Sequence, residues 1–183
     1  KVLERHYTND KATDFAAILT SVKRVNPDLV FYGGMDAQAG PMLRQMKQLG
    51  IKAKLIGGDG ICTTELMRLG GDNVGSNVLC AEGGMALSKM PGGPAFEKRF
   101  KAQFKADIQV YAPFVYDAVM TMGMAMKNAK SADPKKYLPK LKEIRHEGVI
   151  GTIAFDEVGD VLNAAVTLNS YGPQGKFPVK VVN

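Results

Sequence analysis

The sequence predicts an α/β fold whose first half contains a parallel β-sheet. Apolar segments of strand length alternate with segments of helical periodicity, and short connections join them. One such strand, Leu-Val-Phe-Tyr at 29–32, is apolar on both faces, as expected where helices cover both sides of a sheet. Strands joined in this order through helices run parallel, with right-handed crossovers.

The elements of the first half follow in a regular order. Strands are predicted at residues 1–7, 29–32, 54–57 and 77–80. Helices are predicted between them at 15–25, at 39–49, and from Thr63 or Thr64 as the cap of a short helix. Asn26-Pro27 ends the first helix, and Gly50 ends the second, as glycine does at many helix C-termini.

The order of elements changes after Gly84. Three helices follow one another, and their predicted starts are Gly93-Pro94, Ala112 and Asp133-Pro134. The second of them, 112–129, is apolar nearly all round, so its surroundings must bury it. Strands and turns are predicted in the last part of the chain, with a hairpin turn at Asp156–Asp160.

The composition is that of a globular protein. With 45% hydrophobic residues among 183, the chain has enough apolar material for a core. The formal net charge is +6, but the basic residues do not alternate with aromatic ones, so no nucleic-acid partner is predicted. The densest basic segment, 127–148, is interpreted as a solvated helix face. No apolar run approaches the roughly 20 residues that span a bilayer, and no signal peptide is recognisable.

The sequence contains no motif of catalysis or metal binding. The G-x-S-x-G pattern, the phosphate loop and the dinucleotide-binding glycine pattern do not occur. His6 and His146 lie far apart, without ligand-like spacing to Cys, Asp or Glu, and are interpreted as surface histidines. Because no nucleophile can be paired with a base, we predict no enzyme, no metal and no cofactor.

Two cysteines, Cys62 and Cys80, lie near the carboxyl ends of two consecutive predicted strands. They are too far apart in the sequence for a C-x-x-C redox motif. If the two strands are neighbours in the sheet, the two sulfur atoms come close together. The residues alone leave two possibilities, a disulfide or two buried thiols.

Two successive strands end in a glycine pair near an aspartate. Gly33-Gly34 precedes Met35 and Asp36, and Gly57-Gly58 precedes Asp59. Ligands of an open parallel sheet bind beyond the carboxyl ends of its strands, where glycine admits a ligand and an acid can bind a cation. Asp36 stands at the start of a helix and is interpreted chiefly as its cap. Asp59 lies further from a helix start, so a ligand contact explains it as well as a turn does.

Three segments resemble the periplasmic branched-chain amino acid binding proteins, the solute receptors of ABC importers. They are VNPDLVFYGGMDAQAGPMLRQMKQLGIKAKLIGGDG at 25–60, YAPFVYDAV at 111–119 and GVIGTIAFDEVGD at 148–160. The resemblance covers essentially the whole chain. It implies the type I periplasmic-binding-protein fold, in which two doubly wound lobes close over a ligand about a three-stranded hinge.

The same resemblance implies roles for the residues at the strand ends. The family's acid at the GGDG position binds the ligand's ammonium group, which implies that role for Asp59. Relatives that bind leucine carry a tyrosine facing the ligand just after the earlier glycine pair, where this chain has Met35. The ligand-binding candidates are therefore Asp59, Met35, Gly58, Gly34 and Asp36.

The resemblance also implies a division of the chain between two lobes. Residues 1–83 and 168–183 correspond to the second lobe, and residues 84–167 cross the hinge and pack on the first lobe. The first lobe's own sheet would lie upstream of Lys1, together with the opening strand and helix of the second lobe. The chain is thus expected to be the C-terminal half of a receptor, with half of the ligand site elsewhere.

We therefore predict a periplasmic solute-binding protein that delivers a branched-chain or other aliphatic amino acid to a membrane permease. Because Met35 departs from the family pattern, an amide or an organic acid is an alternative ligand. A cytoplasmic ligand sensor with the same fold is a further alternative, and it would contain free cysteines. An exported location favours a disulfide between Cys62 and Cys80.

Overall fold

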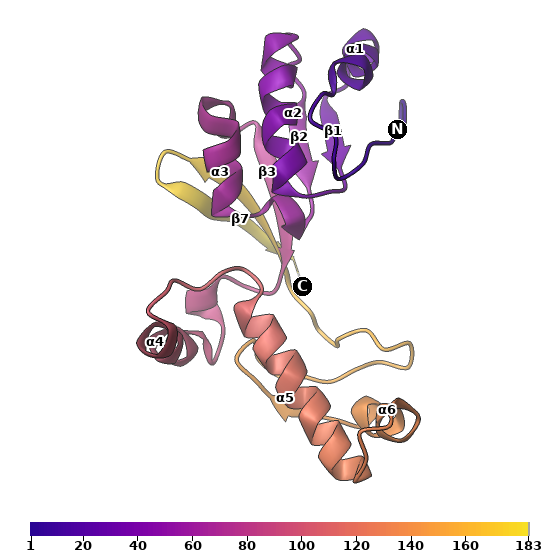
Figure 1. Cartoon of the computed structure of the whole chain (residues 1–183), viewed down its shortest axis with the longest axis vertical. Helices are drawn as coiled ribbons and strands as arrows, with labels where there is room; N and C mark the ends of the chain where they lie inside the picture. Colours follow the sequence, from indigo (N-terminus) through magenta and orange to yellow (C-terminus); the bar gives the residue numbers. More distant parts are fainter. Residues whose placement is uncertain (183) are drawn as a thin grey trace. The chain divides into compact units, whose positions relative to one another are not determined.

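The computed structural model describes residues 1–182 and divides into two compact units (Figure 1). Unit 1 consists of residues 1–83 and 166–182, and unit 2 consists of residues 84–165. The chain therefore leaves unit 1 after its first strands and returns to it for the last two.

Unit 1 contains a five-stranded sheet. Its strands, in spatial order, are β1 (Leu29–Tyr32), β2 (Lys54–Gly57), β3 (Val78–Gly83), β6 (Val166–Gly172) and β7 (Gly175–Val182). The first three are parallel, with Tyr32 opposite Gly57 and Gly57 opposite Cys80. The last two form an antiparallel hairpin beside β3, drawn in yellow in Figure 1. Because β1 and β2 are parallel neighbours, the residues that follow them meet at one edge of the sheet.

Helices and 3₁₀ turns connect these strands. They are α1 (Ala16–Val25), α2 (Asp36–Gln48), η1 (Asp59–Ile61), α3 (Thr64–Gly70) and η2 (Gly71–Asn73). Thr63 is the N-cap of α3, since its hydroxyl accepts a hydrogen bond from the amide of Leu66 at 3.1 Å. Gly50, just after α2, has a φ of 68°, a left-handed conformation that favours glycine. Both predicted helix boundaries are confirmed.

The core of unit 1 packs the helices against the sheet. Its fully buried side chains include Phe15, Leu19, Leu55, Ile61, Leu66, Val78 and Tyr171. Gly40 of α2 allows α3 to approach closely, because a Cβ atom at that position would lie 2.5 Å from Cβ of Leu69. The predicted α/β fold with a parallel sheet is confirmed.

Unit 2 consists mainly of helices. Its elements are η3 (Leu87–Lys89), α4 (Gly93–Phe104), α5 (Ala112–Ala129), α6 (Pro134–Lys142), β4 (His146–Glu147) and β5 (Thr152–Ile153). The three predicted helix starts are confirmed. The carboxylate of Asp117, on α5, is buried and accepts hydrogen bonds from the amides of Val149 and Ile150 at 2.9 and 2.8 Å.

The turn at Asp156–Asp160 is confirmed in detail. One carboxylate oxygen of Asp156 accepts hydrogen bonds from the amides of Val158, Gly159 and Asp160 at 2.8–2.9 Å. Phe155 and Val161 form a bridge across the turn. Aspartate is frequent in turns because its carboxylate can accept hydrogen bonds from the backbone amides that follow it.

The predicted strand at residues 1–7 is wrong. The structure describes this whole segment and contains no strand in it. Val2, Leu3 and Tyr7 are all exposed. The mixture of apolar and charged residues predicted a strand, but a strand forms only beside a neighbour that supplies hydrogen-bond partners, and this segment pairs with none of the described strands.

Across the described residues 1–182, the helices are too short or too polar to cross a bilayer.

Candidate ligand-binding site

The two glycine-aspartate segments form one surface at the carboxyl edge of the sheet. Gly34 and Met35 follow β1, and Gly58 and Asp59 follow β2. The loops touch at Gly60, where an added Cβ atom would lie 2.6 Å from the carbonyl oxygen of Gly34 and 2.7 Å from Sδ of Met35. The structure therefore brings the predicted site residues of both loops together.

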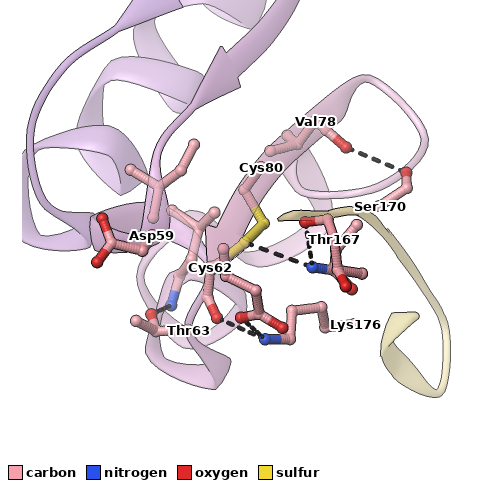
Figure 2. The surroundings of a disulfide bond; sticks show 12 residues. Asp59, Cys62, Thr63, Val78, Cys80, Thr167, Ser170 and Lys176 are labelled. Atoms are coloured by element: carbon pink, nitrogen blue, oxygen red, sulfur yellow. Dashed lines mark hydrogen bonds and ion pairs between the residues drawn. A yellow bond between two sulfur atoms is a disulfide. The ribbon is translucent and has the colours of Figure 1, made fainter. Parts of the chain in front are cut away.

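Asp59 presents an available carboxylate at this edge. Its side chain is exposed, and one oxygen accepts a hydrogen bond from the amide of Gly60 at 3.1 Å. Figure 2 shows the carboxylate pointing away from the nearby cysteines and from Lys176. Within residues 1–182 its second oxygen makes no hydrogen bond. Such a group can accept charge-assisted hydrogen bonds from a bound cation.

Asp36 has a different role from the one expected. The N-cap of α2 is Met35, and Asp36 is the first residue inside the helix, so the interpretation of Asp36 as the cap is wrong. Its carboxylate instead accepts a hydrogen bond from the hydroxyl of Thr63 at 2.6 Å. Because that hydroxyl also caps α3, Asp36 links the starts of two helices. Its negative charge is favourable near both helix N-termini.

Met35 and the two glycines differ in what surrounds them. The Met35 side chain is 53% exposed and its sulfur lies over Gly60. Packing favours glycine at position 34, because a Cβ atom there would lie 2.2 Å from the hydroxyl oxygen of Tyr32 and would displace that ring. Around Gly58 the space is open, with no atom within 4 Å of an added Cβ. Packing thus explains Gly34 but gives no reason for the glycine at 58.

The structure contains a disulfide between Cys62 and Cys80 (Figure 2). Cys80 lies opposite Gly57 in the sheet, and Cys62 follows η1, so the register of β2 and β3 brings the two residues within 5.4 Å between Cα atoms. Cys62 and Cys80 are fully buried. The bond thus connects the loop that carries Asp59 directly to strand β3.

Two residues of the β6–β7 hairpin also contact this loop, and they are not among the candidates that the sequence predicts. The hydroxyl of Tyr171 donates a hydrogen bond to the carbonyl of Ile61 at 2.6 Å, and the ammonium of Lys176 donates one to the carbonyl of Cys62 at 3.0 Å. Lys176 also pairs with the carboxylate of Glu82 at 2.5 Å. Neither residue carries a sequence signal, because the loop carbonyls that they contact lie more than a hundred positions earlier in the chain.

Burial raises the pKa of the Tyr171 hydroxyl above its usual value, and the carboxylates of Glu82 and Asp36 raise it further. The hydroxyl therefore remains protonated at neutral pH and continues to act as a hydrogen-bond donor to the loop.

Within the described part of the chain, no group of three His, Cys, Asp or Glu side chains is arranged to bind a metal ion. His6 lies 2.9 Å from Glu4 near the start of the chain, outside the candidate site.

Comparison with known proteins gives a match to one family over most of the chain. The model of the family described as Periplasmic binding protein matches residues 1–171. Among curated proteins, the chain is 30% identical over 155 residues to the leucine-, isoleucine-, valine-, threonine- and alanine-binding protein of Pseudomonas aeruginosa. It is 31% identical over 154 residues to Leu/Ile/Val-binding protein homolog 1 of Brucella abortus. These matches cover 85% and 80% of this chain, but 41% and 39% of the relatives.

Solved structures give the same result for the fold. A leucine binding protein from Thermotoga maritima superposes with a TM-score of 0.86 at 26% identity, over 98% of this chain and 51% of that protein. A substrate binding protein of a branched-chain amino acid transporter from Streptococcus pneumoniae, in complex with isoleucine, has a TM-score of 0.78 at 24% identity. That match covers 94% of this chain and 49% of the other. The chain therefore spans about half the length of these proteins or less.

Proposed function

This chain belongs to the periplasmic binding protein family, and we propose that it forms one wall of the ligand site in the solute receptor of an ABC importer. The proposed ligand is a branched-chain or other aliphatic amino acid. The receptor would act in the periplasm, deliver its ligand to a membrane permease and catalyse no reaction. Relatives that are named for binding leucine, isoleucine and valine support this choice.

The exposed carboxylate of Asp59 is the observation that carries the proposal. It lies beyond the carboxyl end of β2, at the edge of an open parallel sheet where ligands of such folds bind. An ammonium group that leaves water needs a charged partner, and Asp59 offers an oxygen that the protein itself does not use. The carboxylate of Asp36, in contrast, already accepts a hydrogen bond from the hydroxyl of Thr63. We therefore assign Asp36 the role of supporting the loop and not of binding the ammonium group.

Met35 and Gly58 complete the proposed wall. The exposed thioether of Met35 offers a flexible apolar contact for an aliphatic side chain. The open space at Gly58 lets a ligand approach the backbone. Enclosure of the ligand requires a second lobe, which would also bind the carboxylate of an amino acid.

We further propose that unit 1 belongs to one lobe and that the helices of unit 2 pack on the other. The division into units at residues 83 and 166 supports this proposal, and the family resemblance implies lobe boundaries at 83 and 168. It explains why α5 is apolar nearly all round, because a second sheet would then cover it.

An organic acid is the second candidate ligand. A solute-binding protein from Rhodopseudomonas palustris that holds benzoate has a TM-score of 0.72 to this chain at 14% identity, so the same fold accommodates a ligand without an ammonium group. Such a ligand would leave the Asp59 carboxylate without a cationic partner.

The two candidates are separated by identifying the ligand. Mass spectrometry of ligand released from a receptor that contains this chain and its second lobe should detect an aliphatic amino acid. Calorimetry should then show that L-leucine, L-isoleucine or L-valine binds and that benzoate does not. Release of a carboxylic acid without an amino group, together with benzoate binding, would contradict the proposal.

A further inference from the structure

The loop that carries Asp59 is held by side chains of the β6–β7 hairpin. The carbonyls of Ile61 and Cys62 accept hydrogen bonds from Tyr171 and Lys176 respectively. A third carbonyl, that of Thr63, lies 3.3 Å from the same Tyr171 hydroxyl. Three consecutive backbone carbonyls, beginning two residues after Asp59, thus face this hairpin.

The sheet register explains why these two side chains act together. Tyr171 on β6 and Lys176 on β7 are directly opposite each other, so both project from the same face of the hairpin. Tyr171 is 1% exposed, and the side chains of Lys176 and Glu82 are 20% and 14% exposed. All three groups therefore act largely out of contact with water, where a hydrogen bond to a charged group is strong.

We infer that Tyr171 and Lys176 are positioning residues that set the orientation of Asp59 for ligand binding. This inference rests on the proposed function, since it concerns the same carboxylate. Neither side chain needs to touch the ligand. They act by fixing the η1 turn, which begins at Asp59 and ends at Ile61.

The disulfide and the lysine act on the same residue in different ways. The bond to Cys80 limits how far the Cα atom of Cys62 can move. The bond makes no contact with the carbonyl of Cys62, whereas the hydrogen bond from Lys176 acts on that carbonyl directly. Glu82 in turn fixes the ammonium of Lys176. The orientation of the turn therefore depends on a charged pair that the disulfide does not replace.

Replacing Lys176 by methionine tests this role, because methionine keeps the length of the stem and removes the ammonium. In the Lys176→Met variant, we expect amide hydrogen exchange at residues 59–63 to become at least about tenfold faster, since the loop opens more often. We also expect L-leucine to bind about tenfold more weakly to a receptor that contains both lobes. Lys180→Met is the matched control, because Lys180 is an exposed lysine on the same strand. It should leave exchange and binding unchanged.

A second pair of variants separates positioning from charge and from loss of fold. The double variant Lys176→Met/Glu82→Gln keeps the net charge of the pair at zero. If this variant also binds leucine more weakly than the parent, the loss comes from the Cys62 carbonyl, which has lost its donor, and not from an unpaired Glu82 charge. Tyr171→Phe keeps the buried ring and removes only the donor to Ile61, and it provides a test if the lysine variant does not fold. Lys176→Arg keeps a cationic donor at this position, so it should keep the exchange protection and the affinity of the parent.

Two results would overturn the inference. The first is exchange at residues 59–63 that is the same in Lys176→Met, Tyr171→Phe and the parent. The second is parental affinity in the charge-neutral double variant. Hydrogen exchange is measured without ligand, so it tests the restraint even if leucine is not the ligand. Failure of the proposed function would instead appear as a parent receptor that does not bind leucine.

Discussion

Unit 1 and unit 2 differ in the size of the apolar core that each contains. Unit 1 has a continuous core that runs from Phe15 to Tyr171 and includes the disulfide. Unit 2 buries fewer apolar side chains, among them Phe96 and Ile144. Its exposed apolar residues include Phe104, Tyr111, Val115, Tyr116, Val119, Met120 and Met122. The candidate site thus lies on the unit whose own packing can keep its geometry.

Specific aromatic contacts and hydrogen bonds connect the elements of unit 2. Phe96 packs against Phe100 and Tyr116, with ring centroids 6.0 and 5.2 Å apart. The carboxylate of Asp117 connects α5 to the segment that follows α6 through two backbone amides. A larger apolar core therefore organises unit 1, whereas a few specific contacts organise unit 2, whose exposed apolar side chains gather on α5.

The largest expected effect concerns binding by the isolated chain. We expect the 183-residue chain alone to bind L-leucine at least about a thousandfold more weakly than a receptor with both lobes, because one wall leaves the ligand carboxylate in water. Calorimetry with leucine, isoleucine, valine and alanine is the measurement. Micromolar binding by a monodisperse chain would show that unit 1 is sufficient by itself.

Truncation of a core residue should affect unit 1 strongly. Leu55 is fully buried, so Leu55→Ala should reduce the free energy of unfolding by about 3 kcal/mol through lost burial and the cavity left behind. The matched control is Val119→Ala on α5. This change should alter the free energy of unfolding by less than about 0.5 kcal/mol, because the Val119 side chain is 58% exposed. Hydrogen exchange in each unit reports the two effects. Equal losses would remove the proposed distinction between the units.

Loss of the disulfide should also act on unit 1 alone. The bond closes a loop between residues separated by 18 positions. By reducing the entropy of the unfolded chain, a cross-link of this loop size adds about 3 kcal/mol to the free energy of unfolding, and strain in the folded state can reduce this contribution. Reduction should therefore speed exchange in unit 1 and leave unit 2 unchanged. Thiol titration of the denatured, unreduced protein checks that the bond exists. Two free thiols per chain would argue against it and against an exported location.

The smallest of these effects is expected at Asp117 in unit 2. Asp117→Ala leaves the amides of Val149 and Ile150 without their acceptor, but only the Val149 amide is fully buried, so the total cost is on the order of 2 kcal/mol. Protection of unit 2 should fall, and that of unit 1 should not. Asp133→Ala, which removes only the exposed cap of α6, is a milder control. If Asp117→Ala leaves protection in unit 2 intact, specific polar contacts do not organise that unit.

Local sequence patterns predicted the strands and helices well because their causes are local. The bounds of β1 and β2 and the cap at Thr63 follow from periodicity and from residue types a few positions apart. Asp36 was assigned as a cap for the same reason, but its partner, Thr63, lies 27 positions away. A single sequence contains no signal for such a contact.

The site was predictable only in part for the same physical reason. Parallel strands place their carboxyl ends together, so the meeting of Met35 with the Asp59 loop follows from the fold. The contacts of Tyr171 and Lys176 depend on a hairpin added to the sheet at the end of the chain. The failed strand at residues 1–7 shows the converse, since its pattern suited a strand but no described neighbour pairs with it.

The central claim, that Asp59 binds the ammonium group of an amino acid, is tested most directly by changing both partners. Leucine and 4-methylpentanoate, which lacks only the amino group, are compared by competition binding on the two-lobed receptor and on its Asp59→Asn variant. The variant keeps an oxygen that can accept the Gly60 amide and removes the charge. Asp72→Asn is the matched control, because Asp72 is an exposed carboxylate in η2, away from the Asp59 loop in the sequence.

We expect Asp59→Asn to weaken the binding of leucine by roughly 30-fold to several thousand-fold. This loss corresponds to about 2 to 5 kcal/mol of binding free energy for an ammonium group left without its charged partner. Binding of 4-methylpentanoate should not weaken, and Asp72→Asn should change neither ligand. If Asp59→Asn binds leucine as tightly as the parent, or weakens both ligands equally, Asp59 does not bind the ammonium group and the assignment of an amino acid ligand loses its basis.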